Sequence, residues 1–354
     1  MIKYYTRACN FIYGEKAKNL IKSKKALPLC GNNQIAFDKI EIFTKTKKKI
    51  ISEIFDLKKA KKIKGKKKVK IIRDLQRIKS KRTNFIKNID FKKTCIMGVL
   101  NLTPDSFSDG GKFNTKFKSH LRIKEMIRSG AQIIDIGGES TRPGAKTLQV
   151  EIEWKRVKEV LKNFKKKYKN ISLSLDTRKS EIMHRGKKFG VDIFNDVSGF
   201  KYNSNSINLI KEKKIAKVFH HMKGTPETMQ KNPTYNNVLL DIYDFFEENI
   251  KKNKDVKNII LDPGIGFGKK LKHNLTLISK ISLFHSLGFP ILVGTSRKRF
   301  ISELAGKNDS KERIGGTLGS VLFLLSQGVQ IFRVHNVHEI KQGILIFKKL
   351  LFDQ

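Results

Sequence analysis

Residues 130–138 read GAQIIDIGG, and this short stretch decides the fold. Its near-continuous apolar run ends in two glycines, which is typical of a strand that is buried on both faces of a parallel sheet. Gly130 stands directly before the run, where the C-cap of a preceding helix is expected. The stretch therefore predicts a helix, a tight turn and a buried strand, in that order.

Runs of this kind recur from residue 94 onward. The eight predicted strands lie within 94–103, 131–138, 171–177, 191–198, 216–223, 258–266, 289–298 and 329–337. Segments with helical periodicity lie between them, for example 150–168, 238–250 and 271–284. Strand–helix alternation repeated eight times predicts an α/β fold, the (β/α)8 TIM barrel, over residues 94–354. A doubly wound open sheet is the alternative, because an extra helix-like piece at 311–327 leaves room for an error of one in the strand count.

The chain of 354 residues carries a formal charge of +43, which first suggests a nucleic-acid-binding protein. Residues 1–93 carry +22 of this charge and residues 94–354 carry +21. Aromatic residues are sparse in the lysine-rich part of the first segment, so no base-stacking surface is indicated. We interpret residues 1–93 as a Lys-rich N-terminal extension of unknown role, with candidate strands at 4–13 and 36–43. Nucleic acid is not the expected partner.

The sequence argues against several other classes of protein. No apolar run approaches the ~18 residues of a membrane span, so no membrane partner is expected. The start of the chain lacks the apolar segment of a secretory signal. Three cysteines without a Cys-x-x-Cys pair indicate neither a disulfide framework nor a thiolate zinc site, and they favour the reducing cytoplasm.

Polar side chains follow every predicted strand, at the end where barrel enzymes carry their active sites. They include Asn101, Asp135, Asp176, Asn195, His221, Asp262, Ser296 and Arg333. One polar residue at such a place is often a loop cap, but a complete set predicts a site for a polar, anionic ligand. The Gly-rich stretch 264–269 is not a Walker A loop, because Lys269 is followed by Lys270 rather than by Ser or Thr.

In chain order, these strand ends resemble the signature motifs of the dihydropteroate synthase family. The matching stretches are NLTPDSFSDGG at 101–111, GAQIIDIGGESTRPG at 130–144, Asp176-Thr177, Asn195-Asp196, HMKGTP at 221–226, LDPGIGFGK at 261–269, Ser296-Arg297-Lys298 and Arg333-Val334-His335. The resemblance covers residues 94 to about 350 and says nothing about 1–93. The sequence departs from the family pattern at Arg178, beside the acid of the third motif, and at Thr295.

The resemblance implies a transferase of folate synthesis. Such an enzyme joins 6-hydroxymethyl-7,8-dihydropterin diphosphate to 4-aminobenzoate, with Mg²⁺ as cofactor, and releases diphosphate and 7,8-dihydropteroate. A dissociative displacement at the pterin methylene is expected, because the electron-rich pterin can carry positive charge there. The attacking aniline nitrogen is neutral, so no strong general base is needed. A homodimer and inhibition by sulfonamides, which mimic 4-aminobenzoate, are implied as well.

The resemblance also implies a role for each motif residue. The pterin site comprises Asp176, Asn195, Met222, Asp262, Lys298 and Arg333, and the 4-aminobenzoate site comprises Thr141, Pro143, Phe267, Ser296 and Lys298. The diphosphate site comprises Asn101, Arg142, Arg333 and His335, with Asn101 also the metal ligand; the catalytic set is Asp176, Lys298, Asp109 and Arg333. The main-chain amide of Arg297 is a further candidate for the carboxylate of 4-aminobenzoate.

Two other interpretations stay open at this point. A pterin-binding methyltransferase on the same barrel would need the acids but not the diphosphate-binding residues. A non-catalytic, basic nucleic-acid-binding protein would not need polar groups on every strand end. The Asn101 loop, Arg142 and the 296–298 motif favour the synthase.

Overall fold

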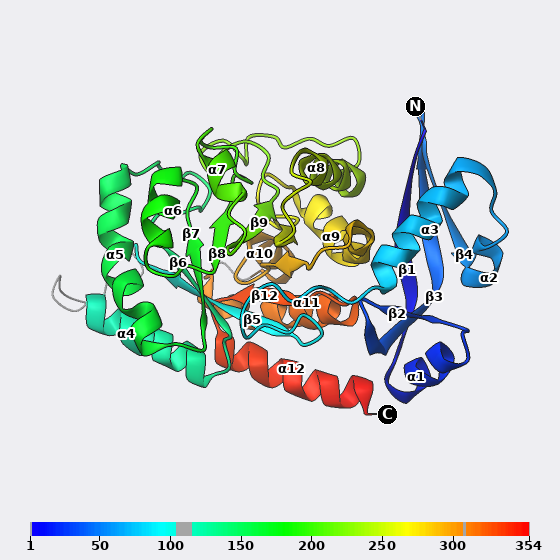
Figure 1. Cartoon of the computed structure of the whole chain (residues 1–354), viewed down its shortest axis with the longest axis horizontal. Coiled ribbons are helices and arrows are strands. Elements are labelled where there is room, and N and C mark those ends of the chain that lie inside the picture. The colour runs from blue at the N-terminus through cyan, green and yellow to red at the C-terminus, as the bar shows by residue number, and fades with distance from the viewer. Residues whose placement is uncertain (1, 104–114, 307–308, 354) are drawn as a thin grey trace.

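A computed structural model describes residues 2–103, 115–306 and 309–353 of the chain. Asp109, predicted as a catalytic residue, lies outside the described residues. Eight parallel strands form the centre of the larger part of the molecule (Figure 1). They are β5 (Cys95–Asn101), β6 (Ile133–Gly137), β7 (Ser172–Asp176), β8 (Ile193–Asp196), β9 (Ala216–His220), β10 (Ile259–Asp262), β11 (Leu292–Val293) and β12 (Ile331–Val334).

The sheet closes on itself. Its strands are ordered β10-β9-β8-β7-β6-β5-β12-β11, and the two ends of this order meet at a parallel bridge between Leu261 and Ile291. The main-chain amide of Leu261 also donates to the carbonyl of Pro290 at 2.9 Å. The prediction of a TIM barrel is therefore confirmed, and the open sheet is excluded.

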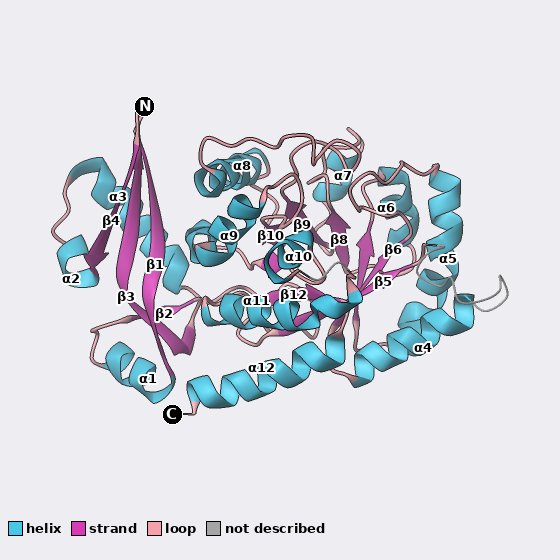
Figure 2. Ribbon diagram, turned by 180° about the vertical axis from the view of Figure 1, so that it is seen from behind, coloured by secondary structure: helices cyan, strands magenta, loops and turns pink. Residues whose placement is uncertain are grey.

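Helices surround the barrel (Figure 2). They are α4 (Thr115–Arg128), α5 (Val150–Lys167), α6 (Ser180–Lys187), α7 (Ser206–Ile210), α8 (Val238–Lys252), α9 (Leu271–Ser279), α10 (Arg299–Ala305), α11 (Ile314–Ser326) and α12 (Val337–Phe352), with 3-10 turns η2 (Ile281–Leu287) and η3 (Lys311–Arg313). The extra helix-like piece of the sequence is α11, which follows α10 before β12. The helix expected over 271–284 is instead split at Lys280, because η2 turns inward and is buried along its whole length.

Side chains of the strands alternate between the barrel interior and the surrounding helices. At one end the interior is apolar, with residues such as Met97, Ile133 and Ile331 in a single cluster. Ile86, Ile89 and Phe91, from the segment before β5, join the same cluster. This segment therefore plugs one end of the barrel, and the polar residues described below occupy the other.

Residues before the barrel fold into a module of their own. It has four antiparallel strands, with β3 paired to β1 on one side and to β2 and β4 on the other. The elements are β1 (Lys3–Tyr13), α1 (Gly14–Lys22), β2 (Leu27–Leu29), β3 (Asn32–Lys45), β4 (Ile50–Asp56), α2 (Leu57–Ala60) and α3 (Gly65–Lys79). The two strands expected within 1–93 are thus confirmed as β1 and β3, and the segment is folded rather than an extended tail.

The sheet of this module meets the barrel along β1, and α3 covers one face of the sheet while also contacting η2 of the barrel. Tyr5 and Phe43 lie opposite each other on β1 and β3, and both belong to the core cluster of the barrel. Ile71 and Ile78 of α3 pack on the other face, in a cluster that Phe352 of α12 also joins. Because each unit contributes residues to the other's core, the module and the barrel stabilise each other.

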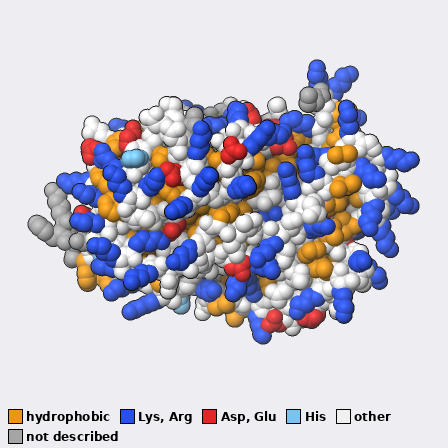
Figure 3. All heavy atoms as spheres, viewed as in Figure 1, with side chains coloured by type: hydrophobic (Ala, Val, Ile, Leu, Met, Phe, Trp, Pro, Cys, Tyr) orange, Lys and Arg blue, Asp and Glu red, His pale blue; other side chains and the backbone are white. Residues whose placement is uncertain are grey.

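Polar contacts fix the orientation of the module. The hydroxyl of Tyr5 donates to Asp244 of α8 at 3.0 Å, and Lys45 forms ion pairs with both Asp241 and Asp244 at 3.2 Å. Lys280 pairs with the buried Glu41 at 2.7 Å. On the face shown in Figure 3, Lys and Arg side chains are spread over the module and the barrel alike. Among the described residues, no helix has the length and apolar character needed to cross a membrane.

Candidate active site

One arginine joins two acids at the polar end of the barrel. Arg333 on β12 donates through Nε to Asp135 and through Nη2 to Asp176, both at 2.7 Å. Asp135, on β6, is completely buried, and Asp176, on β7, is 5% exposed. The planar guanidinium makes these two bonds in a fixed fork geometry, which the flexible ammonium of a lysine does not impose. Two carboxyl groups thus share one guanidinium, and further donors complete their hydrogen bonding.

Neighbouring polar groups complete the surroundings of Asp135. The hydroxyl of Ser174 donates to Oδ1 of Asp135 at 2.6 Å, and the carboxamide of Asn195 donates to Oδ2 at 3.0 Å. The sequence placed Asp135 at a strand end but gave it no role. Its signal was the strand alternation, since it lies two residues after the inward-facing Ile133. A buried charge inside the barrel needs a partner of opposite charge. Arg333 also faces the interior, because it lies two residues after the inward-facing Ile331.

A second acid and a lysine face the same space. Asp262, at the end of β10, accepts from the amide of Gly264 at 2.8 Å, and its other oxygen lies 3.9 Å from Nε2 of His220. Burial lowers the pKa of His220 well below its usual range, so this contact is not an ion pair. Lys298 places its ammonium 3.9 Å above the ring centre of Phe267, and Gly266 allows the close approach of its stem.

Burial moves the pKa values of these groups toward each other. It raises the pKa of Asp176 to about 8, against the effect of Arg333 and together with repulsion from Asp135. It likewise raises the pKa of Asp262 to about 6. The pKa of Lys298 falls to about 8 because of burial and repulsion from Arg333. Strongly shifted, mutually facing groups of this kind are typical of a functional site.

Ser296 and His335 meet at the rim of the barrel. Oγ of Ser296 lies 3.0 Å from Nδ1 of His335 and also accepts from the main-chain amide of His335 at 3.2 Å. The residues expected at the 4-aminobenzoate and diphosphate sites are therefore adjacent. The expectation for the amide of Arg297 is wrong, because this amide already donates to Oγ1 of Thr317 at 3.1 Å. The Arg297 guanidinium is likewise engaged, with Asn336.

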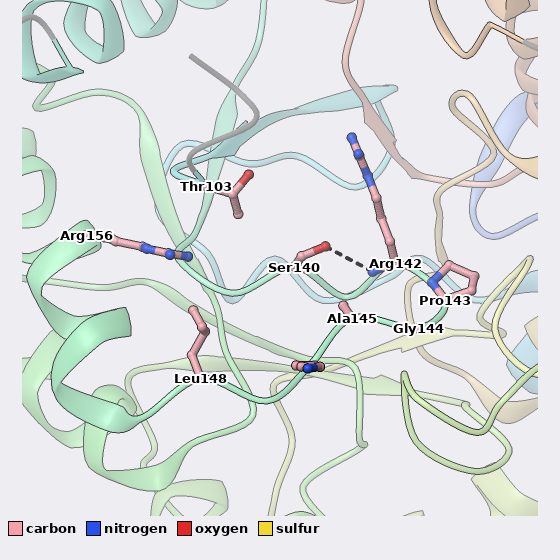
Figure 4. Close-up of a pocket in the computed structure, with 9 residues that line it drawn as sticks. Thr103, Ser140, Arg142, Pro143, Gly144, Ala145, Leu148 and Arg156 are labelled. Carbon is pink, nitrogen blue, oxygen red and sulfur yellow. Dashed lines mark hydrogen bonds between the residues drawn. The ribbon is translucent and has the colours of Figure 1, made fainter. Parts of the chain in front are cut away.

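The loop between β6 and α5 carries three predicted residues outside the central cluster. Thr141, Arg142 and Pro143 are more exposed than the buried acids. Arg142 and Pro143 line a surface cavity of about 350 Å³ together with Thr103. In Figure 4 the side chain of Arg142 extends away from the loop backbone, while Arg156 reaches toward the cavity from α5. Among the described residues, no hydrogen bond joins the Arg142 side chain to the acids.

Two further predicted site residues, Asn101 and Met222, are partly buried. Asn101 is partly buried at the end of β5, and its carboxamide makes no side-chain hydrogen bond with the described residues. Met222 is partly buried and packs in a small cluster with Phe267, Val197 and Met229.

Lys269 has a structural role that the sequence left open. Its buried ammonium donates to the carbonyls of Phe267 at 2.9 Å and His221 at 3.3 Å, and it lies 3.1 Å from Nδ1 of His221. It therefore braces the loops after β9 and β10 and does not face solvent, which agrees with the rejection of a Walker A loop.

Comparison with known proteins identifies the family. Residues 97–335 match the sequence model of pterin-binding enzymes. A dihydropteroate synthase of Synechocystis is 37% identical over 255 residues, which are 71% of this chain and 88% of that protein. The chain belongs to the dihydropteroate synthase family. It is thus a transferase of folate biosynthesis, as the sequence motifs predicted.

Solved dihydropteroate synthases share the fold. The Yersinia pestis enzyme, solved with a sulfonamide drug, has a TM-score of 0.69 and 34% identity, covering 74% of this chain and 96% of that one. The Xanthomonas albilineans enzyme, solved with 4-aminobenzoic acid, has a TM-score of 0.69 and 32% identity, covering 74% and 94%. The match to the family model begins at residue 97, after the N-terminal module.

Proposed function

We propose that the chain binds the pterin ring between the central acids and Lys298 and transfers its methylene to 4-aminobenzoate. The observation that carries this is the pairing of Arg333 with Asp135 and Asp176 at the polar end of the barrel. A pterin presents adjacent N–H donors and a carbonyl acceptor along one edge. Asp176, Asn195 and Asp262 supply acceptors and a carboxamide for that edge, and Lys298 supplies a donor.

In the proposed reaction, the bond between the methylene carbon and the diphosphate oxygen breaks first, and its electron pair leaves with diphosphate. The carboxylate of Asp176 stabilises the resulting cationic methylene; Asp109, outside the described residues, is proposed to do the same. The aniline nitrogen then attacks the carbon and releases one proton. Arg142, Arg333 and His335 are proposed to bind the departing anion, because charge-assisted hydrogen bonds favour the negative charge that develops there.

The residues present fit a magnesium ion that arrives with the diphosphate. Among the described residues there is no group of three side chains that could hold a metal alone. Asn101 offers one neutral oxygen ligand at the strand end, and Mg²⁺ commonly combines few protein ligands with substrate phosphates and water. We propose Asn101 as that ligand. The ion would neutralise charge on the leaving diphosphate.

The 4-aminobenzoate is proposed to lie at the rim, against Phe267, Ser296, Lys298 and the loop with Thr141 and Pro143. The hydrogen bond between Ser296 and His335 supports a position beside the proposed diphosphate site. A sulfonamide is expected to compete with 4-aminobenzoate here. The three cysteines are free and buried, which fits the proposed cytoplasmic location.

The dependence of kcat/KM on pH tests this assignment. For the pterin substrate, kcat/KM reports ionisations of the free enzyme. It should rise between pH 6 and 8, as Asp262 with a pKa of about 6 and Asp176 with a pKa of about 8 lose their protons. It should fall above pH 8, as Lys298 with a pKa of about 8 loses its proton.

The variant Lys298→Arg provides the control for the alkaline limb. Arginine keeps its charge at every pH of the experiment, so the decline above pH 8 should disappear while the rise below pH 8 remains. An unchanged alkaline limb in this variant, or a flat profile in the parent chain, would contradict the roles given to these groups.

A second copy of the chain is proposed to cover the late helices. Phe323 on α11 and Leu345, Ile346 and Leu350 on α12 are about half exposed or more. Gly319 lies on the same face of α11 as Phe323, with open space above its Cα atom, so another helix can approach closely. Large exposed apolar side chains in one area mark an interaction surface. Light scattering of the purified chain measures whether its mass is that of a dimer.

A further inference from the structure

A buried cluster of four charges lies beside the central acids and has no part in the proposed chemistry. Glu139 accepts from Nε of Arg178 at 2.9 Å and from Nζ of Lys179 at 2.7 Å, and Lys179 also pairs with Glu153. None of the four side chains is more than 4% exposed. Two acids and two bases balance, which is the condition under which buried charges are tolerated.

The cluster joins the two ends of one loop. Gly138 follows β6, and Glu139 is the next residue. The carboxylate of Glu139 also accepts from the main-chain amide of Leu148 at 2.8 Å, just before α5. Glu153, in the first turn of α5, accepts from the hydroxyl of Thr177 at 2.6 Å. The loop between these points carries Thr141, Arg142 and Pro143. The carboxylate of Glu139, which is paired with Arg178 and Lys179, therefore joins the two ends of this loop.

Arg178 makes a second contact with the α5 end of the loop. Its Nη2 atom donates to Oγ1 of Thr147 at 2.8 Å, and its guanidinium stacks 4.5 Å from the ring centre of Tyr202. Arg178 lies close to the third motif, Asp176-Thr177, in the sequence. It stands two residues after Asp176, so one short segment contributes the pterin acid and the clamp of the neighbouring loop.

We propose that Arg178 is a positioning residue, which holds the loop of Thr141, Arg142 and Pro143 in place through Glu139 and Thr147. This inference rests on the proposed function of that loop in binding 4-aminobenzoate and diphosphate. It assigns to Arg178 no contact with substrate. Its loss should therefore weaken the use of 4-aminobenzoate and leave the binding of the pterin ring unchanged.

The variant Arg178→Met removes the charge and the hydrogen bonds but keeps most of the side-chain volume. Hydrogen exchange measured by mass spectrometry should become at least about tenfold faster in residues 140–148, because hydrogen bonds to a charged group are lost there. The KM for 4-aminobenzoate should rise on the order of tenfold. Titration with 6-hydroxymethylpterin, which lacks the diphosphate, should give an unchanged affinity.

Arg185→Met is the matched control. Like Arg178, Arg185 pairs with a glutamate, here Glu151 through two bonds, and lies over an aromatic ring, that of Trp154 at 5.6 Å. It joins α6 to α5 and does not touch the loop. This variant should change neither the exchange of residues 140–148 nor the KM for 4-aminobenzoate. Arg178→Lys, which keeps the charge but cannot hold Glu139 and Thr147 together, should fall between the parent and Arg178→Met.

Each outcome of the experiment decides the proposal. Exchange that stays slow in residues 140–148, or that accelerates throughout the barrel, overturns it. If Arg178→Met does not fold, Thr147→Val removes the exposed hydroxyl together with its contacts to Arg178 and Glu227. It should show the same two changes at smaller size, and no change in that variant also overturns the proposal. The exchange result does not depend on turnover, so a chain that made no dihydropteroate would reject the proposed function while leaving the loop contacts testable.

Discussion

Replacing Arg333 with methionine is expected to lower kcat/KM for the pterin substrate by more than about 10³-fold. Removal of one preorganised charge partner at a developing charge commonly costs about 10²–10³ in rate. Arg333 pairs with Asp176 and is proposed to bind the diphosphate as well. The variant should also unfold more easily. Breaking a buried ion pair by removing one partner costs about 3–5 kcal/mol, and Asp135 and Asp176 would both lose their cation.

A double variant separates the effect on folding from the effect on turnover. In Asp135→Asn/Arg333→Met the uncompensated charge at Asp135 is gone, so the temperature of unfolding should recover toward that of the parent chain. Turnover should stay low, since Asp176 still lacks its partner. Parent-like turnover in either variant would remove Arg333 from the active site. Thermal unfolding followed by circular dichroism, together with steady-state kinetics, makes both measurements.

Deleting residues 1–80 is expected to leave a barrel that does not fold into a stable, soluble form. The deletion keeps the plug of Ile86, Ile89 and Phe91 but removes Tyr5 and Phe43 from the barrel core. It also uncovers η2 and the face of α8 that carries Tyr243, both now buried. Exposed apolar surface of this extent favours aggregation. Solubility after expression and the thermal unfolding of any soluble fraction test the prediction.

Single substitutions test the same contact more gently. Phe43→Ala should lower the free energy of unfolding by about 3–5 kcal/mol, the usual cost of truncating a buried phenylalanine. Ile54→Ala on β4 of the same module is the control, because Ile54 is 64% exposed and its truncation should change stability little. A soluble 81–354 fragment with the unfolding temperature and activity of the full chain would show that the barrel does not depend on the module.

The sequence predicted the barrel because its strands are buried on both faces. Runs such as 131–138 are then apolar along their length, and the glycines before them, Gly130 and Gly328 among others, take the positive φ of a helix C-cap. The N-terminal module was harder to predict, because lysine dominates its composition. Only the contacts of β1 and β3 with the barrel on one face and with α3 on the other show why their apolar residues are there.

The site was predictable where a residue's own strand places it. Asp176, Asn195 and Arg333 lie at inward-facing positions, where Arg333 pairs with Asp176 and Asn195 donates to Asp135. Contacts made across long stretches of chain were not predictable. Thr317, on α11, accepts a hydrogen bond from the main-chain amide of Arg297. Glu139 pairs with Arg178 and Lys179, which follow the neighbouring strand β7. No local pattern in the sequence records such pairings.

The most direct test of the central claim is the formation of dihydropteroate by the purified full-length chain. The reaction would contain Mg²⁺, 6-hydroxymethyl-7,8-dihydropterin diphosphate and labelled 4-aminobenzoate, with the Lys298→Ala variant in parallel. We expect labelled 7,8-dihydropteroate from the parent chain only when the pterin diphosphate is present, and a rate at least about 10²-fold lower from the variant. No product above background from the parent chain, or equal rates from the two proteins, would contradict the account.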